Sequence, residues 1–174
     1  PKCQNLIRFV FDPVRKRMST VCEVPGKAGY NKRVHVKGAS EIVLEAYTAG
    51  LFPMAENHKD QELFWVDPTW RGILPLDGFH VPRSLKRRIR QNPYEMRYDY
   101  DFEAVIDACA KSTSDRQETW INREIIGLYT ELFYMGYVHS VECWSKGILV
   151  GGLYGLSMRG VFFGESMFSR ERDA

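Results

Sequence analysis

The last third of the chain contains three runs with the composition of β-strands, separated by two short turn signals. The runs are His139–Trp144, Ile148–Leu156 and Val161–Phe168. Ser145–Gly147 and Ser157–Gly160 join them, and connections this short that contain glycine are typical of β-hairpins. Consecutive strands joined by hairpins pair antiparallel, so the segment predicts an antiparallel meander.

Helical patterns precede this meander and place the chain in the α+β class. Each pattern has a start or stop signal, such as a capping Ser, Asp or Asn, or a terminating Gly or Pro. The expected helices are Ser40–Tyr47 before Gly50, Pro82–Arg90 before Pro93, Phe102–Ala110 after Asp101, and Asn122–Tyr137 with a stop near Gly136.

Short extended segments are expected between the helices. Leu63–Val66 and Tyr94–Tyr98 read as strands, and Ile73–Leu76 as further extended structure. Leu51–Met54 reads as a turn with large apolar groups, which Pro53 favours.

Length and composition exclude several classes of protein. At 174 residues the chain suggests one domain, or one domain with a small lobe. Its apolar runs are far shorter than the 18 to 20 residues or so that cross a bilayer, so no membrane partner is expected. The four cysteines form no Cys-x-x-Cys pair and the four histidines are scattered. We therefore expect no metal site, no disulfide framework and a reducing, cytoplasmic location.

The charge of the chain is uneven. Residues 1–38 carry a net charge of +7, so the remaining residues carry −5 of the overall +2. This segment reads as an irregular basic extension in which Leu6–Phe11 could form a strand and Gly26–Lys37 is a loop. It indicates a polyanionic partner or a targeting arm.

A second basic group lies in the expected helix Pro82–Arg90. On a helix Arg83, Arg87 and Arg90 fall within about 60° of each other. Each guanidinium group can donate two parallel hydrogen bonds to the oxygens of one phosphate. Leu85 and Ile89 fall on the opposite side and are expected to anchor the helix to a core. The alternative is an ordinary solvated helix face, but no acidic residue offsets the five cations between 83 and 90.

Three tryptophans lie near turns or strand ends, at 65, 70 and 120. A nucleobase stacked on such a ring gains about 1–3 kcal/mol, so the rings favour single-stranded nucleic acid as a ligand. Core packing is the alternative for each of them.

Glu165 is a carboxylate within an apolar strand. Strict alternation puts Phe163, Glu165 and Met167 on one face of this strand. A buried carboxylate requires a cation or hydrogen-bond donors, and a substrate ammonium group would serve; a structural ion pair to Arg170 is the alternative. Gly151 and Gly152 in the preceding strand indicate a bulge or a close approach of the backbone.

Several familiar nucleotide and hydrolase motifs are absent from the sequence. It contains no Gly-x-Gly-x-x-Gly, P-loop, His-Glu-x-x-His or Gly-x-Ser-x-Gly motif. A dedicated nucleotide cofactor site is therefore not expected.

From about Ala46 to Ala174 the chain closely resembles the leucyl/phenylalanyl-tRNA–protein transferase family. The matching segments occur in order over about three quarters of the chain. They are Ala46–Glu56, Leu63–Pro68, Phe79–Leu85, Thr119–Asn122, His139–Glu142, Gly151–Gly155 and Phe163–Arg170.

The resemblance implies an enzyme that takes Leu, Phe or Met from an aminoacyl-tRNA and joins it to the N-terminal Arg or Lys of an acceptor protein. This reaction marks the acceptor for degradation in the N-end rule pathway. The resemblance also implies a cytoplasmic monomer with a GNAT-like (acetyltransferase-like) lobe that needs neither a metal nor acetyl-CoA. Consistently, Ser169–Ala174 lacks the turn that holds acetyl-CoA pyrophosphate in ordinary members of that fold.

Family roles carry over to individual positions. Glu165 corresponds to the acidic residue that engages the α-amino group of the aminoacyl moiety, and Trp120 to the ring that stacks on the terminal adenine. The apolar pocket for the amino-acid side chain corresponds to Leu153, Phe162 and Met167. The basic positions that hold the tRNA acceptor stem correspond to Arg83, Arg87 and Arg90.

The expected organisation is a basic extension at 1–38, which matches none of the family's segments, a small lobe at 39–69 and a GNAT-like catalytic lobe at 70–174. We expect this lobe to be incomplete at its C-terminal end. Two functions outside the resemblance remain as alternatives, a non-catalytic RNA-binding module and a small-molecule N-acetyltransferase.

Overall fold

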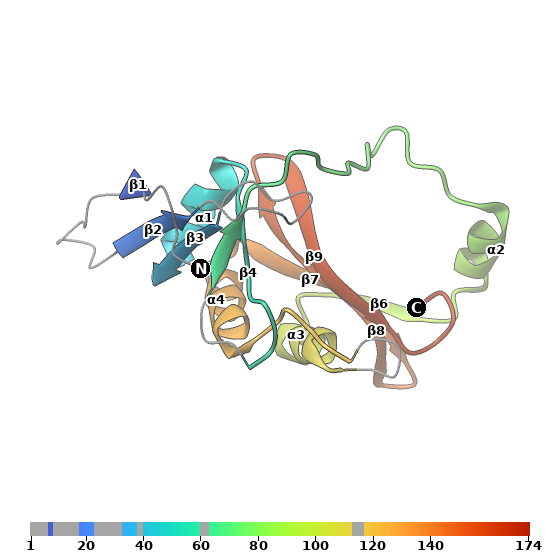
Figure 1. Cartoon of the computed structure of the whole chain (residues 1–174). Coiled ribbons are helices and arrows are strands. Elements are labelled where there is room, and N and C mark those ends of the chain that lie inside the picture. The colour runs from blue at the N-terminus through green and yellow to red at the C-terminus, as the bar shows by residue number, and fades with distance from the viewer. Residues whose placement is uncertain (1–6, 9–17, 23–32, 38–39, 60–62, 113–116) are drawn as a thin grey trace. The chain divides into compact units, whose positions relative to one another are not determined.

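The structure is a computed structural model that describes residues 1–174 except 1–6, 9–17, 23–32, 38–39, 60–62 and 113–116 (Figure 1). The chain divides into two compact units. The N-terminal unit consists of Pro1–Gly72 and Ser112–Tyr129, and the C-terminal unit consists of Ile73–Lys111 and Thr130–Ala174.

A five-stranded antiparallel sheet forms the N-terminal unit, in the order β1-β2-β3-β5-β4. Its strands are β1 (Ile7–Arg8), β2 (Met18–Cys22), β3 (Arg33–Lys37), β4 (Phe52–Met54) and β5 (Phe64–Val66). The possible strand at Leu6–Phe11 is confirmed where it contains β1, and the interpretation of residues 1–38 as irregular is wrong where these residues form β2 and β3. The valines of Arg33–Lys37 alternate with polar residues, which is a strand pattern that the basic composition obscured.

The segment expected as a turn at Leu51–Met54 also forms a strand, β4. Pro53 lies in this strand and pairs with Trp65 of β5. A proline cannot donate a ladder hydrogen bond, and β4 tolerates it because β4 is the edge strand of the sheet. The predicted strand at Leu63–Val66 is confirmed as β5.

Helix α1 (Ser40–Thr48) confirms the first predicted helix, and it ends before Gly50, whose φ is +85°. The predicted cap is not made: the Ser40 hydroxyl is buried and has no hydrogen-bond partner among the described residues. The hydroxyl groups of Tyr47 and Tyr129 lie 2.6 Å apart in the interior, which joins α1 to the first part of α4 (Arg123–Tyr134).

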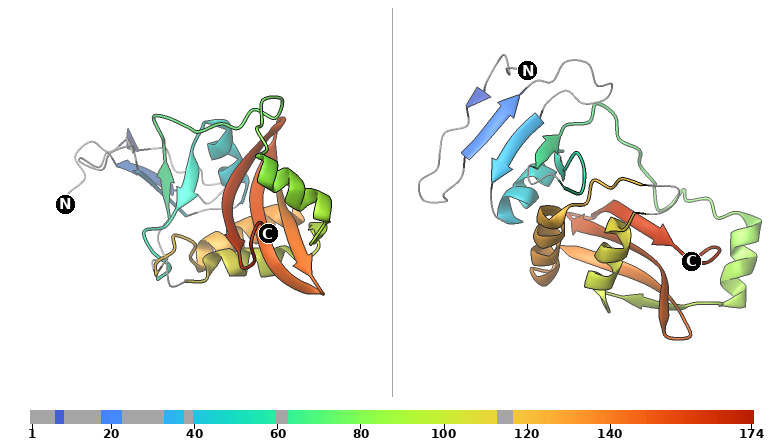
Figure 2. Two further views of the ribbon diagram at one scale, coloured as in Figure 1. Left: turned by 90° about the vertical axis from the view of Figure 1, so that its right-hand side faces the viewer. Right: turned by 60° about the horizontal axis from the view of Figure 1, so that its bottom comes forward.

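A four-stranded antiparallel sheet forms the C-terminal unit, in the order β6-β7-β8-β9. Its strands are β6 (Glu95–Tyr98), β7 (Val138–Ser145), β8 (Ile148–Met158) and β9 (Val161–Ser169), and α3 (Phe102–Ala110) lies against one face (Figure 2). With two antiparallel sheets and four helices in the described part of the chain, the α+β class is confirmed.

Two-residue turns close both predicted hairpins of this sheet. Lys146 and Gly147 have φ values of 51° and 78°, and Arg159 and Gly160 have 51° and 80°. Two successive positive φ values are the signature of the type I′ turn, whose twist matches that of paired strands. The meander is therefore confirmed, with shorter connections than the sequence indicated.

The core of the C-terminal unit lies between α3 and the sheet. Val105, Ile106 and Cys109 of α3 and Tyr154 and Leu156 of β8 have no exposed surface. Burial of one side chain of this size contributes about 1.5–3 kcal/mol, so this layer contributes substantially to the stability of the unit. The Asp101 carboxylate accepts from the Ala104 amide and caps α3, as predicted.

The segment from Ile73 to α2 (Arg83–Gln91) packs much less closely. Ile73, Leu74 and Leu76 are 79%, 75% and 94% exposed, and this segment pairs with no strand among the described residues. Ile89 of α2 is 60% exposed, so the prediction that an apolar face anchors this helix is also wrong. In the described part of the chain, no helix has the length and apolar character needed to cross a membrane.

Candidate functional site

The pairing of β8 with β9 contains a β-bulge at Glu165. Gly155 pairs with Gly164 and Tyr154 pairs with Ser166, so Glu165 is an extra residue on β9. The extra residue reverses the alternation of the side chains that follow it. The expectation that Met167 shares a face with Phe163 is therefore wrong.

The bulge gathers three of the predicted site residues on one face of the sheet. Met167 pairs with Leu153, and Phe162 pairs with Ser157, so Leu153, Phe162 and Met167 share a face. This face is opposite α3, because a side chain at Gly152, one residue away from Leu153, would meet Val105 of α3. Phe162 and Met167 are 45% and 68% exposed, and Leu153 is half-buried.

Gly155 leaves room for the ring of Phe162. A Cβ atom at Gly155 would lie 2.5 Å from the Phe162 ring and 2.3 Å from the carbonyl oxygen of Phe163. Leu153 reaches the same place from β8, since a Cβ atom at Gly164 would lie 3.8 Å from its Cδ1 and 4.0 Å from the Phe162 ring. The three residues therefore form a continuous apolar surface over the glycines, which we call the apolar face.

A substitution tests this close approach. We expect Gly155→Ala to destabilise the protein by about 1–3 kcal/mol, because the added methyl group must displace backbone or an aromatic ring. Urea unfolding measures the free energy. Gly127→Ala is the matched control: Gly127 is an exposed α4 residue with open space around it, so the same methyl group should stabilise by about 0.5–1 kcal/mol. Equal effects of the two changes would contradict the packing described above.

The carboxylate of Glu165 lies at this bulge and is half-buried. Burial, followed by the negative charge of Glu165, raises the pKa of Tyr154 well above its ordinary value. Arg170, the alternative partner for Glu165, donates from Nη1 to the carbonyl oxygen of Leu149 and lies over the ring of Phe168. A half-buried carboxylate at an irregular strand position is suited to binding a cation.

Trp120 lies in the N-terminal unit, immediately before α4. Thr119 and Asn122 on either side of it are buried, and their side chains accept hydrogen bonds from the amides of Ile121 and Ile125. The Asn122 cap of α4 is therefore confirmed. Trp120 itself is half-buried, so a fixed backbone presents part of its ring to solvent.

The three predicted arginines of α2, Arg83, Arg87 and Arg90, are all exposed. The inner side of this helix is held by Arg88, whose guanidinium lies over the ring of Tyr94 and donates to its hydroxyl. The Tyr94 hydroxyl in turn donates to the carbonyl oxygen of Arg172 at 2.7 Å. A cation–π contact thus takes the place of the apolar anchor that the sequence predicted.

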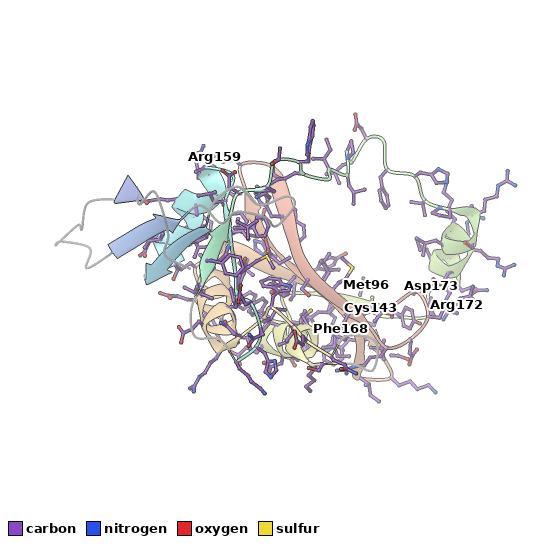
Figure 3. All side chains as sticks on the ribbon, viewed as in Figure 1. Met96, Cys143, Arg159, Phe168, Arg172 and Asp173 are labelled. Carbon is purple, nitrogen blue, oxygen red and sulfur yellow. The ribbon has the colours of Figure 1, made fainter. Side chains whose placement is uncertain are left out.

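A polar cavity of about 160 Å³ lies between α2 and the segment after β9. Figure 3 shows Arg172 and Asp173 beside the helix. The Nε atom of Arg88 is buried and has no hydrogen-bond partner in the described part of the structure. The lining residues are Ser84, Arg87, Arg88, Gln91, Arg172 and Asp173, so three guanidinium groups and one carboxylate meet here. The cavity is suited to an anionic group.

Sequence reasoning missed two groups of polar residues near the start of α3. Glu142 is fully buried and accepts four hydrogen bonds, from the amides of Tyr100 and Asp101, the Ser140 hydroxyl and the Trp144 indole. The only available signal was the alternation of polar residues in His139–Glu142. Periodicity does not show which loop such residues meet.

The second missed group is the hydrogen-bonded pair of Asp99 and His139. Oδ1 of Asp99 accepts a hydrogen bond from the Ser140 amide. Oδ2 of Asp99 lies 2.8 Å from Nδ1 of His139. Asp99 has a φ of 51°, a left-handed conformation that aspartate adopts more readily than most residues. Among the described residues, no group of three or more His, Cys, Asp or Glu side chains could hold a metal ion.

Comparison with known proteins decides the family. Residues 73–174 match the sequence model of the leucyl/phenylalanyl-tRNA protein transferase family, and residues 40–69 match that of its N-terminal domain. The first match alone covers more than half of the chain. This chain belongs to the leucyl/phenylalanyl-tRNA protein transferase family. The resemblance inferred from its sequence motifs is therefore confirmed.

A member of this family from Paramagnetospirillum magneticum (strain ATCC 700264 / AMB-1), a leucyl/phenylalanyl-tRNA–protein transferase, is 56% identical over 135 residues. The aligned region covers 78% of this chain and 65% of that transferase. The chain therefore spans just under two thirds of the length of this relative. The bulge, the apolar face, Trp120 and α2 all lie within the region that matches the transferase family.

Proposed function

We propose that this chain belongs to a cytoplasmic aminoacyltransferase that moves Leu, Phe or Met from an aminoacyl-tRNA to the N-terminal Arg or Lys of an acceptor protein, as the first step of N-end rule degradation. The observation that carries the proposal is the bulge at Glu165. It places a carboxylate in the same stretch of β9 that carries the exposed side chains of the apolar face.

The apolar face receives the side chain of the transferred amino acid. Leu, Phe and Met are all unbranched at Cβ, so each can extend along a surface formed by Leu153, Phe162 and Met167. A misfitting or missing methylene group costs about 1–3 kcal/mol in such a pocket, which is sufficient to select among apolar side chains. A polar side chain would lose its hydration without gaining hydrogen bonds there.

Glu165 orients the α-ammonium group of the same amino acid. A carboxylate and an ammonium form a charge-assisted hydrogen bond about twice as strong as a neutral one. Glu165 is half-buried, so water and salt screen its interaction with the ammonium group less than they would at an exposed site. Side chain and amine together then fix the position of the ester carbonyl.

The reaction is a direct aminolysis. The acceptor's amine attacks the ester carbonyl carbon, a C–N bond forms, and the bond from that carbon to the ribose oxygen breaks. The ester is already activated, so the protein contributes by positioning and by placement of charge. No covalent enzyme intermediate is required.

Trp120 and α2 bind the RNA. The partly exposed ring of Trp120 stacks on the terminal adenine, and Arg83, Arg87 and Arg90 contact phosphates of the acceptor stem. Arg87 also lines the polar cavity beside α2, together with Arg88 and Arg172, which supports an anionic ligand at this part of the helix.

The antiparallel sheet with α3 on one face supports a GNAT-like lobe at 70–174, and the match at 40–69 supports a separate small lobe at 39–69. We propose that the enzyme acts as a monomer and needs neither a metal nor acetyl-CoA.

Salt dependence tests the RNA-binding face. We expect the triple change Arg83→Ala, Arg87→Ala and Arg90→Ala to weaken binding of Phe-tRNA and to reduce the slope of log affinity against log salt by about 2 to 3, because each lost phosphate contact removes close to one released counterion. Filter binding between 50 and 300 mM salt measures both. The control, Lys59→Ala with Lys111→Ala, removes exposed cations that belong to neither α2 nor the segment around Trp120 and should leave the slope unchanged. An unaltered slope in the triple variant would refute this assignment.

Transfer of labelled Phe from Phe-tRNA to a peptide that begins with Arg tests the function itself. The assay uses the 174-residue chain and, side by side, the chain extended by whatever its reading frame encodes after Ala174. A peptide that begins with Ala is the negative acceptor. Binding of Phe-tRNA without transfer by either protein would favour a non-catalytic RNA-binding module. A rise in thermal stability on addition of acetyl-CoA would favour an N-acetyltransferase.

A further inference from the structure

The polar cavity beside α2 adjoins the row of arginines that is expected to bind RNA. Four side chains of α2 line the cavity, at intervals of three and four residues that place them on one face of the helix. They are Ser84, Arg87, Arg88 and Gln91. Arg87 also belongs to the arginine row, because it lies within about 60° of Arg83 and Arg90 around the helix. The cavity therefore continues the row, with Arg87 common to both.

The segment after β9 forms the opposite wall of the cavity, and its backbone is held in place. The Arg170 amide donates to the carbonyl oxygen of Val150 at 2.7 Å, and the carbonyl oxygen of Arg172 accepts from the Tyr94 hydroxyl at 2.7 Å. The Arg172 side chain is 86% exposed, and its Nε atom lies 3.6 Å from Oδ2 of Asp173. The wall is thus fixed through its backbone, while the Arg172 guanidinium stays open to solvent and to a ligand.

The cavity carries a net positive charge. Its lining holds three guanidinium groups and the carboxylate of Asp173, which sum to +2. Ser84 and Gln91 add neutral donors. The volume of about 160 Å³ is several times the roughly 30 Å³ that one water molecule occupies in the liquid, so a group of the size of a phosphate fits. Guanidinium groups match phosphate oxygens with paired hydrogen bonds.

Arg88 contributes a donor that the described part of the protein leaves unused. Its Nη2 atom donates to the Tyr94 hydroxyl at 3.2 Å, and its guanidinium lies over the Tyr94 ring, so the side chain is held. Its Nε atom is buried and has no hydrogen-bond partner among the described residues. A buried donor without an acceptor is costly, and an anion bound beside Arg88 would supply the missing acceptor.

We propose that this cavity binds a phosphate group of the tRNA backbone, which adds Arg88 and Arg172 to the residues that hold the RNA; this inference rests on the proposed function. The acceptor protein does not match the charge, because its N-terminal Arg or Lys is cationic and the cavity repels it. RNA carries a negative charge at every phosphate. Since Arg87 is shared, one RNA strand can contact the arginine row and the cavity together.

Arg172→Ala tests the wall after β9, because it removes the guanidinium and keeps the carbonyl oxygen that Tyr94 holds. We expect it to weaken binding of Phe-tRNA about 10-fold at 50 mM salt and to reduce the slope of log affinity against log salt by about 0.7 to 0.9. Filter binding measures both, with the 174-residue chain and with the extended chain. Lys111→Ala removes an exposed cation outside the cavity and should change neither quantity.

Asp173→Asn should have the opposite effect. It removes the carboxylate from the cavity, and Asn accepts the left-handed backbone at this position, where φ is 61°. We expect Phe-tRNA to bind about 3- to 10-fold more tightly, because the phosphate no longer meets a like charge. Glu171→Gln makes the same change of charge on an exposed side chain outside the cavity lining and should leave the affinity nearly unchanged.

The Nε–H group of Arg88 reports occupancy of the cavity directly. In an isotopically labelled chain, we expect its nuclear magnetic resonance signal to shift when Phe-tRNA is added, and Arg172→Ala to reduce this shift. Inorganic phosphate at millimolar concentration is the second probe. A shift with inorganic phosphate and none with Phe-tRNA would mean that the cavity binds free phosphate, which would overturn the proposal.

The outcomes separate this inference from the proposed function. If the triple α2 variant loses affinity and slope while Arg172→Ala and Asp173→Asn bind as the parent does, the cavity does not hold RNA and the proposed function stands. If the parent binds no Phe-tRNA at any salt concentration, in either length, both are overturned.

Discussion

Glu165→Gln should lower kcat/KM for transfer of Phe from Phe-tRNA by about 10²- to 10³-fold. The change keeps the shape and the hydrogen-bonding oxygen of the side chain but removes the negative charge that holds the donor's ammonium group. Loss of one preorganised electrostatic contact in an active site has effects of this size. This decrease in kcat/KM should be larger than the decrease caused by truncating any single residue of the apolar face, because a misfitting group there costs about 1–3 kcal/mol.

Initial rates with labelled Phe-tRNA and an Arg-starting peptide measure this effect. Glu131→Gln is a matched control, because it removes an exposed carboxylate from α4 outside the proposed site and should transfer at the parent rate. Circular dichroism confirms that both variants fold. A Glu165→Gln variant that transfers as fast as the parent would show that the carboxylate at the bulge does not engage the donor, and the proposed site would then need another cation-binding group.

Glu142→Ala should reduce the free energy of unfolding by about 3–5 kcal/mol, a large fraction of the 5–15 kcal/mol typical of a domain. The change removes a buried carboxylate and leaves four donors without their acceptor. Each buried donor left unsatisfied costs about 1–3 kcal/mol, and the partly buried ones recover some of this by binding water. The amides of Tyr100 and Asp101 precede α3, so the start of that helix should loosen first.

The division of bonds between the two oxygens of Glu142 gives a graded test. Oε1 accepts three of the bonds and Oε2 accepts one, from the Trp144 indole at 2.9 Å. Gln keeps an oxygen for the first three and turns an NH2 group toward the indole. We therefore expect Glu142→Gln to cost about half as much as Glu142→Ala in urea unfolding. Equal losses for Gln and Ala, or losses under about 1 kcal/mol for both, would contradict this account.

The sequence by itself determined the elements whose signals are local. The hairpins of the meander follow from Lys146–Gly147 and Arg159–Gly160, where positive φ is required and glycine provides it. The caps at Asp101 and Asn122 were predictable because each side chain bonds an amide three residues ahead. The family motifs, found in the expected order, determined the family, because motifs can be compared between sequences before the fold is known.

The tertiary structure alone decided the features that depend on partners distant in the chain. Alternation within β9 predicted the wrong face for Met167, because the bulge at Glu165 arises from the register with β8 and not from the sequence of β9. Ile89 is exposed because the contact that holds α2 is made by Arg88 with the ring of Tyr94. Glu142 can be buried because amides of the loop before α3 donate hydrogen bonds to it. The pairing of Asp99 with His139 joins residues 40 apart in sequence. Local propensity carries no information on such contacts, because their free energy exists only once the strands have been brought into register.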